Sequence, residues 1–419
     1  MGHRATLRRL GPCLALALAC APARPDLILI VLDTVRADRL SACGYERPTS
    51  PHLEQLAGRP DVAFTCFAEA PATWTIPSHA SFLTGLSYPE HGAGIGGFRR
   101  PAPLSVELGT LPLQLTGYQT MLVSGNPLLG KAGLDRGFEV RRVAMDYGEL
   151  YGQALAEALG AALAERDRSR PLFLLLNISD AHMPWAAVPT GHPWLPETPG
   201  LRSGGPEREL RRRLYSGRLG AEERAAFLER RSRLYDHAVE RADATLERTL
   251  GVLRRAGLLD NGYRLVVTSD HGERLGEDRV LGHGPYDLRE SVTRVPLLFE
   301  SDRDPRPSLT RPVAALEAYS LLLDGAPSGA PVVAAASLRS IAWWGPGEKL
   351  VWMTSKELVR YPGLEDGGPG EPAPEHPRRA ELQRLAREME GRWRSAQGRR
   401  DEEAERLGRE LRALGYVDD

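Results

Sequence analysis

Lysine is scarce in this sequence, and charge of neither sign is in excess. Almost all of the basic residues are arginine, because lysine occurs only at Lys131, Lys349 and Lys356. The 54 lysine and arginine residues are balanced by 55 aspartate and glutamate residues, which leaves a formal net charge of -1 at pH 7. A chain without a basic excess has no overall field that attracts nucleic acid, so we expect no nucleic-acid partner.

The N-terminal region lacks a hydrophobic run long enough to cross a membrane. Its apolar stretch, Gly11 to Cys20, is far shorter than the run of about 20 residues that a bilayer requires. Arg4, Arg8 and Arg9 precede this stretch and small residues end it, which is typical of a signal peptide. We therefore predict a signal peptide over residues 1–25 and export to the periplasm or the cell surface.

Cysteine is rare too, with four residues in the chain. Residues 17–20 (ALAC) resemble a bacterial lipobox, so Cys20 is a candidate lipidation site that would anchor the protein to a membrane. The small residues 21–23 (APA) offer ordinary signal-peptide cleavage as the alternative. Export also permits a disulfide between Cys43 and Cys66, although two buried thiols fit the sequence equally well.

Five apolar runs recur along the first three quarters of the chain. Continuous runs of this kind are typical of parallel strands that are buried on both faces. Helical patterns separate them, the clearest over residues 235–256, which Gly257 ends. This alternation predicts an α/β fold with a mostly parallel central sheet flanked by helices. The five runs are 27–32, 120–123, 172–176, 265–268 and 295–299.

The pattern changes after about residue 304, so we assign residues 26–304 to the main domain and 305–419 to a C-terminal subdomain. In the second part, apolar runs at 341–344 and 350–354 flank a Gly-Pro-Gly turn, which predicts a β-hairpin. Residues 378–414 form a charged helical pattern. These elements predict a small α+β subdomain with a hairpin and a helical tail.

Acidic and imidazole side chains directly follow three of the predicted strands. In an open parallel sheet, ligands bind beyond the carboxyl ends of the strands. We therefore expect these side chains to converge at one edge of the sheet. They are Asp33 after the first run, Asp180 and His182 after the third, and Asp270 and His271 after the fourth.

Residues 72–85 (ATWTIPSHASFLTG) place a hydroxyl at the start of a helix. Pro77 suits the first helical turn, so Thr75 lies at the N-terminus, where free N–H groups and the helix dipole favour an oxyanion. The segment resembles the signature of the sulfatase family of the alkaline phosphatase superfamily, in which a nucleophile precedes x-Pro-Ser-Arg. The resemblance implies an alkaline-phosphatase-like fold with Thr75 as nucleophile, and His79 stands where the family has arginine.

The resemblance also implies a metal site. Residues 269–273 (SDHGE) follow a buried run and match the second metal motif of the superfamily. The implied ligands are Asp33, Asp270, His271 and the oxygen of Thr75. Thr34 stands where the family often has a further aspartate ligand, and it is included in the metal site either as a weak ligand or as a hydrogen-bonding neighbour. Such a mixed donor set suits one hard or borderline divalent cation. Calcium is implied if the protein is sulfatase-like, and magnesium, manganese and zinc suit the same donors.

Two further histidines complete the anion site that the resemblance implies. His182 ends a strand-end Asp-x-His motif of the family and is implied to contact the bound anion or the leaving group. His283 stands where many sulfatases have a lysine or histidine near the leaving oxygen, and a histidine there can act as a general acid. Together with Thr75 and His79, these are the candidate catalytic residues.

The chain departs from the family pattern at two places that bear on the chemistry. Sulfatases carry a cysteine or serine that is oxidised to formylglycine, whereas the methyl group of Thr75 prevents formation of that aldehyde. The family segment Gly-Lys-x-His is replaced by residues 124–127 (SGNP), which contain neither lysine nor histidine. The implied sulfate-binding site therefore contains fewer charged or imidazole side chains than the family pattern has.

The candidate residues favour a metal-dependent hydrolase of sulfate or phosphate esters. Its expected partner is an anionic ester, of which a glycan or a lipid head group forms the organic part. Two alternatives stay open on the sequence. One is a transferase that moves phosphoethanolamine or phosphoglycerol onto envelope glycans or lipids, and the other is an inactive relative that only binds an anionic glycan.

Overall fold

The computed structural model describes residues 24–200, 205–285, 288–329, 331–336, 340–353, 356–362, 370–398 and 402–414. Residues 1–23 of the proposed signal peptide, with Cys20 among them, lie outside these residues. The main element is an eight-stranded sheet. In the order in which they lie side by side, its strands are β10 (Val313–Ala314), β2 (Ala63–Glu69), β9 (Arg294–Ser301), β6 (Tyr263–Thr268), β1 (Asp26–Leu32), β5 (Leu172–Ile178), β3 (Gln119–Ser124) and β4 (Val140–Val143).

The predicted α/β architecture with a mostly parallel sheet is confirmed. Each of the five apolar runs lies in a strand, and β6, β1, β5, β3 and β4 pair in parallel. The run at 295–299 differs from the expectation, because β9 is antiparallel to both of its neighbours, β6 and β2. Its two faces are nevertheless buried, which is why its composition resembles that of a parallel strand.

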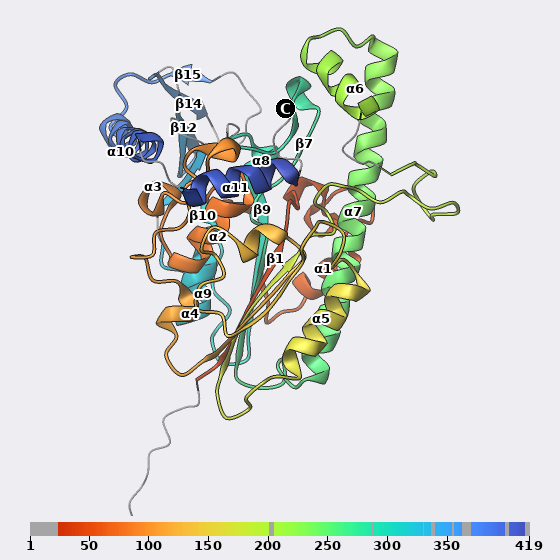
Figure 1. Ribbon diagram of the computed structural model, residues 1–419, viewed down its shortest axis with the longest axis vertical. Helices are drawn as coiled ribbons and strands as arrows, with labels where there is room; N and C mark the ends of the chain where they lie inside the picture. The colour runs from red at the N-terminus through yellow and green to blue at the C-terminus, as the bar shows by residue number, and fades with distance from the viewer. Residues whose placement is uncertain are drawn as a thin grey trace, which may run out of the picture.

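Helices cover both faces of the sheet (Figure 1). Alternate side chains of β1 point to opposite sides, so that Ile28 and Ile30 lie in one core and Leu27 and Leu29 in the other. The first core is closed by α1 (Pro51–Ala57), α5 (Gln153–Leu163) and α7 (Ala221–Arg255), and the second by α2 (Thr75–Thr84), α4 (Leu111–Gln114), α9 (Ala318–Asp324) and α11 (Glu402–Ala413).

The predicted helix at 235–256 is the second half of a longer one. α7 spans 35 residues and begins at Ala221. Its first turns and α6 (Gly205–Tyr215) project beyond the sheet at the upper right of Figure 1. They are held by a small apolar cluster in which Phe227 packs with Leu214 and Leu281. The hairpin of β7 (Arg274–Leu275) and β8 (Leu281–Gly282) is thereby fixed to α7.

The C-terminal part contains a second, antiparallel sheet, as the α+β expectation requires. The predicted hairpin is present, with Trp344 opposite Lys349. The helical tail is divided in two: α10 (Arg379–Gly398) packs on this sheet, whereas α11 returns to the main core through Leu407 and Leu411. The strands, in order, are β11 (Val332–Ala336), β12 (Ser340–Gly345), β13 (Glu348–Trp352), β14 (Leu358–Pro362) and β15 (Glu371–Pro372).

Cys43 and Cys66 form a disulfide, with their Cα atoms 5.6 Å apart. The sequence was compatible with a disulfide or with two buried thiols, and the structure has the disulfide. It joins the loop after β1 to β2, two segments that are 23 residues apart in sequence. The remaining short helices are α3 (Tyr88–His91) and α8 (Glu290–Thr293).

A buried acid lies where the second sheet meets the main domain. Glu69, at the end of β2, is 1% exposed, and neither of its carboxylate oxygens has a hydrogen-bond partner in the described residues. Burial raises the pKa of Glu69 to about 8, although the charge of Lys349 opposes the shift. Lys349 is also buried and donates to the carbonyl of Leu288 at 2.8 Å. Glu69 is therefore protonated and neutral at pH 7.

We expect this acid to make the protein less stable as the pH rises. The unfolded chain loses the Glu69 proton near pH 4.5, whereas the folded chain keeps it up to about pH 8, so stability falls between these values. Glu69→Gln, which mimics the neutral acid, should flatten this fall. Thermal unfolding of both proteins at pH 6 and pH 9 measures the effect, and an equal loss of Tm in the variant would show that Glu69 does not cause it.

Candidate functional site

The candidate site lies at the carboxyl edge of the main sheet. Asp33 and Asp270, from the ends of β1 and β6, and His271 are fully buried. One ligand atom from each of these three residues lies within 4.8 Å of the other two. Neighbouring parallel strands end at the same level, and this brings together groups that are more than 200 residues apart in sequence. The sequence-based expectation of convergence is met by these three side chains.

Thr34 turns the chain between the two carboxylates. Its backbone has φ 63°, a left-handed conformation that is uncommon for threonine. In this conformation its N–H donates to Asp270 Oδ1 at 3.1 Å, and its hydroxyl donates to Asp33 Oδ1 at 3.0 Å. The phenol of Tyr235 donates to the Thr34 carbonyl at 2.7 Å. Thr34 therefore holds both acids in place, and its hydroxyl is already directed at Asp33.

Thr75 is the first residue of α2 and is fully buried. The preceding residue, Trp74, gives no side-chain cap, Pro77 has no N–H, and the N–H of Ser78 donates to the carbonyl of Trp74 at 3.3 Å, so Thr75 and Ile76 carry the N–H groups at the start of the helix that this turn leaves without a cap. This hydroxyl lies 3.5 Å from His271 Nε2 and 3.3 Å from the amide nitrogen of Asn126. The predicted nucleophile is thus beside the acid and imidazole group.

The hydrogen bonds of His271 and Asp270 fit a bound cation. His271 Nδ1 donates to the carbonyl of Gly272 at 2.9 Å, so Nε2 of the neutral ring carries a lone pair. That lone pair lies 3.3 Å from Asp270 Oδ2, which accepts no hydrogen bond from the described residues. Two acceptors at this distance repel each other unless a cation or a shared proton lies between them. Burial and the nearby charge of Asp33 also raise the pKa of Asp270 well above its usual range.

Asp33 has the opposite electrostatic environment. Its Oδ2 accepts hydrogen bonds from Asn126 at 2.6 Å, Ser179 at 3.2 Å and Asn177 at 3.3 Å. Burial raises the pKa of Asp33, but the neighbouring imidazoles and the Asn126 bond outweigh it and bring the pKa to about 2. Asp33 is therefore kept as a carboxylate.

His79 lies one turn after Thr75 and faces the same group. Its Nδ1 donates to the Thr75 carbonyl at 3.0 Å, and its Nε2 accepts from Asn177 at 3.3 Å. Burial lowers the pKa of His79 to about 4, although Asp33 opposes the shift. A neutral, hydrogen-bonded ring therefore replaces the arginine of the family pattern and orients the start of α2.

The other two candidate histidines lie on the far side of the group. His182 directs Nδ1 to the carbonyl of Met183 at 2.6 Å, and burial lowers its pKa. His283 directs Nδ1 to a carboxylate oxygen of Glu273 at 2.8 Å. The ring of His283 lies 4.4 Å from that of His271 and 5.2 Å from that of His182, measured between centroids. All of the sequence-predicted catalytic and metal residues are thus close together.

Several polar residues of the site were not among the candidates, including Asn177 and Ser179, which donate to Asp33. Asn126 follows β3 and contacts Asp33 and Thr75, Glu273 carries His283, and Tyr147 stacks on His182 with ring centroids 4.1 Å apart. The strand-end rule that selected Asp33 would also have found Asn126, because it lies two residues after a buried strand. Glu273 belongs to the SDHGE motif. Nothing in the sequence marks Tyr147.

One expected member is absent from the group. Asp180 points away from Asp33 and Asp270, toward the N–H of Gly152 and the guanidinium of Arg241, both at 3.4 Å. Burial raises the pKa of Asp180 to about 6, although Arg241 opposes the shift. The reason is that both residues lie beyond the end of β5, in a turn in which the N–H of His182 donates to the carbonyl of Ser179 at 3.0 Å, so strand alternation no longer places residues 180 and 182 on one side.

A second group of potential metal ligands, His192, His237 and Glu240, lies on α7 and the loop before α6. Its chemistry does not favour a metal. His192 Nδ1 accepts from the N–H of Leu195 at 3.1 Å, so Nε2 carries the proton and donates to Glu240 at 2.8 Å. Both ring nitrogens of His192 are thus used, and these contacts attach the loop to α7.

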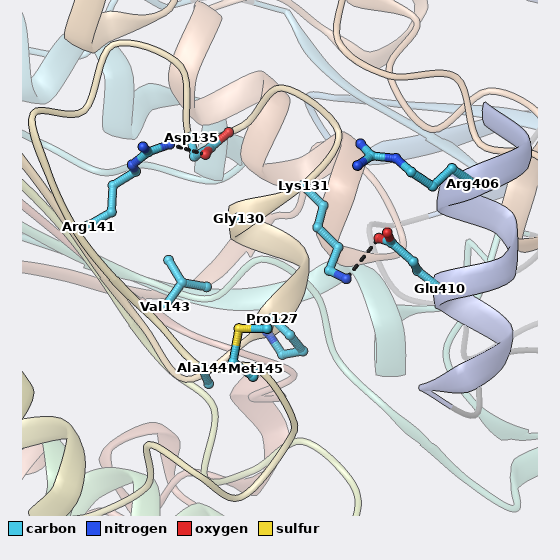
Figure 2. Close-up of a pocket in the computed structure, with 10 residues that line it drawn as sticks. All are labelled: Pro127, Gly130, Lys131, Asp135, Arg141, Val143, Ala144, Met145, Arg406 and Glu410. Carbon is cyan, nitrogen blue, oxygen red and sulfur yellow. Dashed lines mark hydrogen bonds and ion pairs between the residues drawn. The ribbon is translucent and has the colours of Figure 1, made fainter. Parts of the chain in front are cut away.

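A pocket of about 420 Å³ is lined by residues that are neighbours in sequence of two site residues, Asn126 and Tyr147 (Figure 2). It begins at Pro127, directly after Asn126, and Met145 on its rim is two residues before Tyr147. Two ion pairs border it: Lys131 with Glu410 of α11 at 2.8 Å, and Arg141 with Asp135 at 2.6 Å. Val143 and Ala144 supply apolar surface.

A family model described as Sulfatase matches residues 25–324, which is more than half of the chain. The chain belongs to the sulfatase family. No curated protein gives a match. In the described part of the chain, no helix has the length and apolar character needed to cross a membrane.

Many solved structures share the fold of this sulfatase-family chain. The phosphonate monoester hydrolase of Agrobacterium radiobacter has a TM-score of 0.60 at 17% identity, covering 81% of this chain and 89% of its own. A protein solved with its substrate D-glucosamine-2-N,6-O-disulfate has a TM-score of 0.60 at 16% identity, covering 91% and 99%. A putative sulfatase from Bacteroides thetaiotaomicron has 0.58 at 14% identity, covering 89% and 92%. At these identities the likeness concerns the fold.

Proposed function

We propose that this chain hydrolyses sulfate or phosphate esters, with Thr75 as nucleophile and one divalent cation held by Asp33, Asp270 and His271. The observation that carries the proposal is the arrangement of acceptors. The Thr75 hydroxyl, His271 Nε2 and Asp270 Oδ2 face one another, and a bound cation would take the place of the proton that the raised pKa of Asp270 favours there. The named activities of the structural relatives, on a phosphonate monoester and on a sulfated sugar, agree with this class of reaction.

Different residues of the chain carry out different steps of the reaction. A divalent cation, when bound, supplies a Lewis acid that lowers the pKa of the Thr75 hydroxyl and offsets negative charge in the transition state. With its hydroxyl proton already released to solvent, Thr75 Oγ1 attacks sulfur or phosphorus, and the bond from that atom to the alcohol oxygen breaks. The N–H groups of Thr75 and Ile76 at the start of α2 donate to the anion as charge develops on it. His182 donates through Nε2 only in its protonated form, because its Nδ1 already donates to the carbonyl of Met183.

His283 and Glu273 are suited to move the proton. In the first step, His283 gives a proton to the departing alcohol oxygen, and the Glu273 carboxylate on its other nitrogen stabilises the charged ring before that transfer. In the second step, His283 takes a proton from water, which attacks sulfur or phosphorus of the Thr75 ester. Sulfate or phosphate leaves and Thr75 is restored.

The organic part of the ester is proposed to be a glycan or a lipid head group. The pocket of Figure 2 is its candidate position, because the pocket starts next to Asn126 and ends next to Tyr147. Paired charges along its border offer both donors and acceptors to hydroxyl groups, and its apolar surface suits the carbon faces of a sugar ring.

The function is tested by metal analysis of the purified protein together with assays on an aryl sulfate, an aryl phosphate monoester and an aryl phosphodiester. We expect one equivalent of divalent metal and turnover of at least one of these esters that is lost with a chelator and restored by metal. Metal-bound protein that turns over none of them would contradict the proposed hydrolase and favour binding without turnover.

We also propose that the protein is exported and anchored to a membrane through lipid on Cys20. Only five residues separate Cys20 from β1, so the folded domain would lie close to the membrane surface. In a bacterial host, the full chain should fractionate with membranes, and Cys20→Ser should release it to the soluble fraction. Full-chain protein that is soluble before the substitution would contradict the lipid anchor.

A further inference from the structure

We infer that Arg231 of α7 is a positioning residue for the proton transfer at His283, and that through Arg231 the projecting helix α6 takes part in the reaction. The hydrogen bond between Glu273 and His283 is the last in a series of contacts that begins on α6 at Glu207. The inference deepens the proposed function and rests on it, because it requires His283 to protonate the departing alcohol oxygen.

Arg231 is a buried positive charge between two buried acids. Its side chain is 2% exposed, and its Nη1 donates to Glu207 Oε1 at 2.9 Å. Its Nη2 lies 3.9 Å from Glu273 Oε1. Within the described part of the chain, these two carboxylates are its only acidic partners. A charge at this depth is stable only where it is paired, so the positions of the three side chains depend on one another.

The contact with Arg231 fixes the direction in which the Glu273 carboxylate faces. Oε1 lies toward Arg231, and Oε2 accepts the hydrogen bond from His283 Nδ1 at 2.8 Å. A rotation that broke the bond to His283 would also move Oε1 away from the positive charge. The bond to Glu273 keeps a proton on Nδ1, and Nε2 is therefore the ring nitrogen that transfers the proton in the proposed reaction.

The backbone of Glu273 is held separately from its side chain. Its carbonyl accepts a hydrogen bond from Arg36 at 2.8 Å, so the chain keeps its path through the SDHGE motif without help from Arg231. Loss of Arg231 is therefore expected to disturb the carboxylate of Glu273 and to leave the metal ligand His271 in place.

The shape of the arginine side chain suits a residue that joins several elements. Its planar guanidinium reaches both acids and also lies 4.9 Å from the ring centroid of Trp185 and 6.0 Å from that of Phe227. Phe227 belongs to the small apolar cluster that holds α6, the helix at the upper right of Figure 1. Trp185 closely follows His182, and its indole N–H donates to the carbonyl of Ala181 at 2.8 Å. Arg231 thus connects α6 with the segments that carry both site histidines.

The test measures how strongly turnover depends on the leaving group. It compares the phenyl and 4-nitrophenyl esters of whichever acid, sulfuric or phosphoric, the metal-loaded full chain releases faster. 4-Nitrophenolate departs with little help from an acid, whereas phenolate requires a proton. His283→Gln should therefore lower kcat/KM on the phenyl ester by a factor of about 10² more than on the 4-nitrophenyl ester.

The test variant for Arg231 is Glu207→Gln/Arg231→Met. Arg231→Met alone would leave Glu207 buried without a partner, whereas the double substitution makes both positions neutral and is expected to fold. It should lower kcat/KM on the phenyl ester about tenfold more than on the 4-nitrophenyl ester, with unchanged metal content. Addition of His283→Gln to this variant should give no selective loss beyond that of His283→Gln itself, because both act on one proton transfer.

Asp26→Asn/Arg166→Met is the matched control. This ion pair, 2.8 Å long, is also largely buried, but it lies at the amino end of β1, and its loss should leave the ratio between the esters unchanged. A ratio that stays at the wild-type value in Glu207→Gln/Arg231→Met, while it changes in His283→Gln, would overturn the inference and leave the proposed function standing. An unchanged ratio in His283→Gln would overturn both the inference and the proposed role of His283.

Discussion

Asp270→Asn is expected to abolish tight binding of the divalent cation, while the metal-free protein stays at least as stable as the wild type. The substitution removes the one carboxylate of the group that lacks a donor for Oδ2. It also relieves the repulsion between two buried acids, whose ligand atoms lie within 4.8 Å of each other. Elemental analysis measures the first effect, and thermal unfolding after chelation measures the second.

The same unfolding experiment shows what the metal contributes. Added cation at 100 times its Kd should stabilise the wild type by about 2.7 kcal/mol and should leave Asp270→Asn unaffected. Asp180→Asn is the matched control, because Asp180 is a buried acid at the same sheet edge that faces Arg241 instead of the group. One equivalent of metal in Asp270→Asn would show that the site lies elsewhere.

The parts of the site that the sequence predicts share a local signature. Asp33, Asp270 and His271 each follow a buried strand within a few residues, and Thr75 begins a helix marked by Pro77. A parallel sheet places such strand ends at one edge whatever the connections between them are. For these residues, the local sequence pattern and the geometry of a parallel sheet are enough to predict their place in the site.

Tyr147 shows what sequence pattern cannot supply. It follows β4, an edge strand of four residues with two arginines at its centre, whose pattern is too short and polar to predict a strand. Its contact with Asn126 depends on how the loop after β4 folds back over β3, and no residue type marks that path. The antiparallel direction of β9 could not be predicted either. The composition of a strand depends on whether its faces are buried and does not depend on its direction.

The start of α7 was missed because its first turns lie outside the main core. Residues 221–234 are rich in arginine and glutamate, and they are buried mainly through Phe227 and its partners in the small cluster with Leu281. The apolar stripe that marks residues 235–256 faces the sheet, whereas the extension supports the hairpin before His283. The two parts of α7 thus pack on different neighbours, and each part has the apolar pattern that its own neighbour requires.

Thr75→Ala is the substitution with the largest expected effect on turnover. Removal of a nucleophile typically costs a factor of roughly 10⁴ or more in kcat, since the remaining groups only bind and polarise the ester. Thr75→Ser should retain appreciable activity, because the hydroxyl remains in the same place at the start of α2. Mass spectrometry should find residue 75 unmodified in the active wild type, which separates this chemistry from that of a formylglycine.

The matched control for Thr75→Ala is Thr84→Ala, at the other end of the same helix. The Thr84 hydroxyl donates to the carbonyl of Ala80 at 2.7 Å and contacts none of the site residues, so its loss should leave kcat near that of the wild type. Far-ultraviolet circular dichroism and metal content should match in both variants. If Thr75→Ala kept full activity, a water molecule would be the nucleophile, and Thr75 would serve only to begin α2.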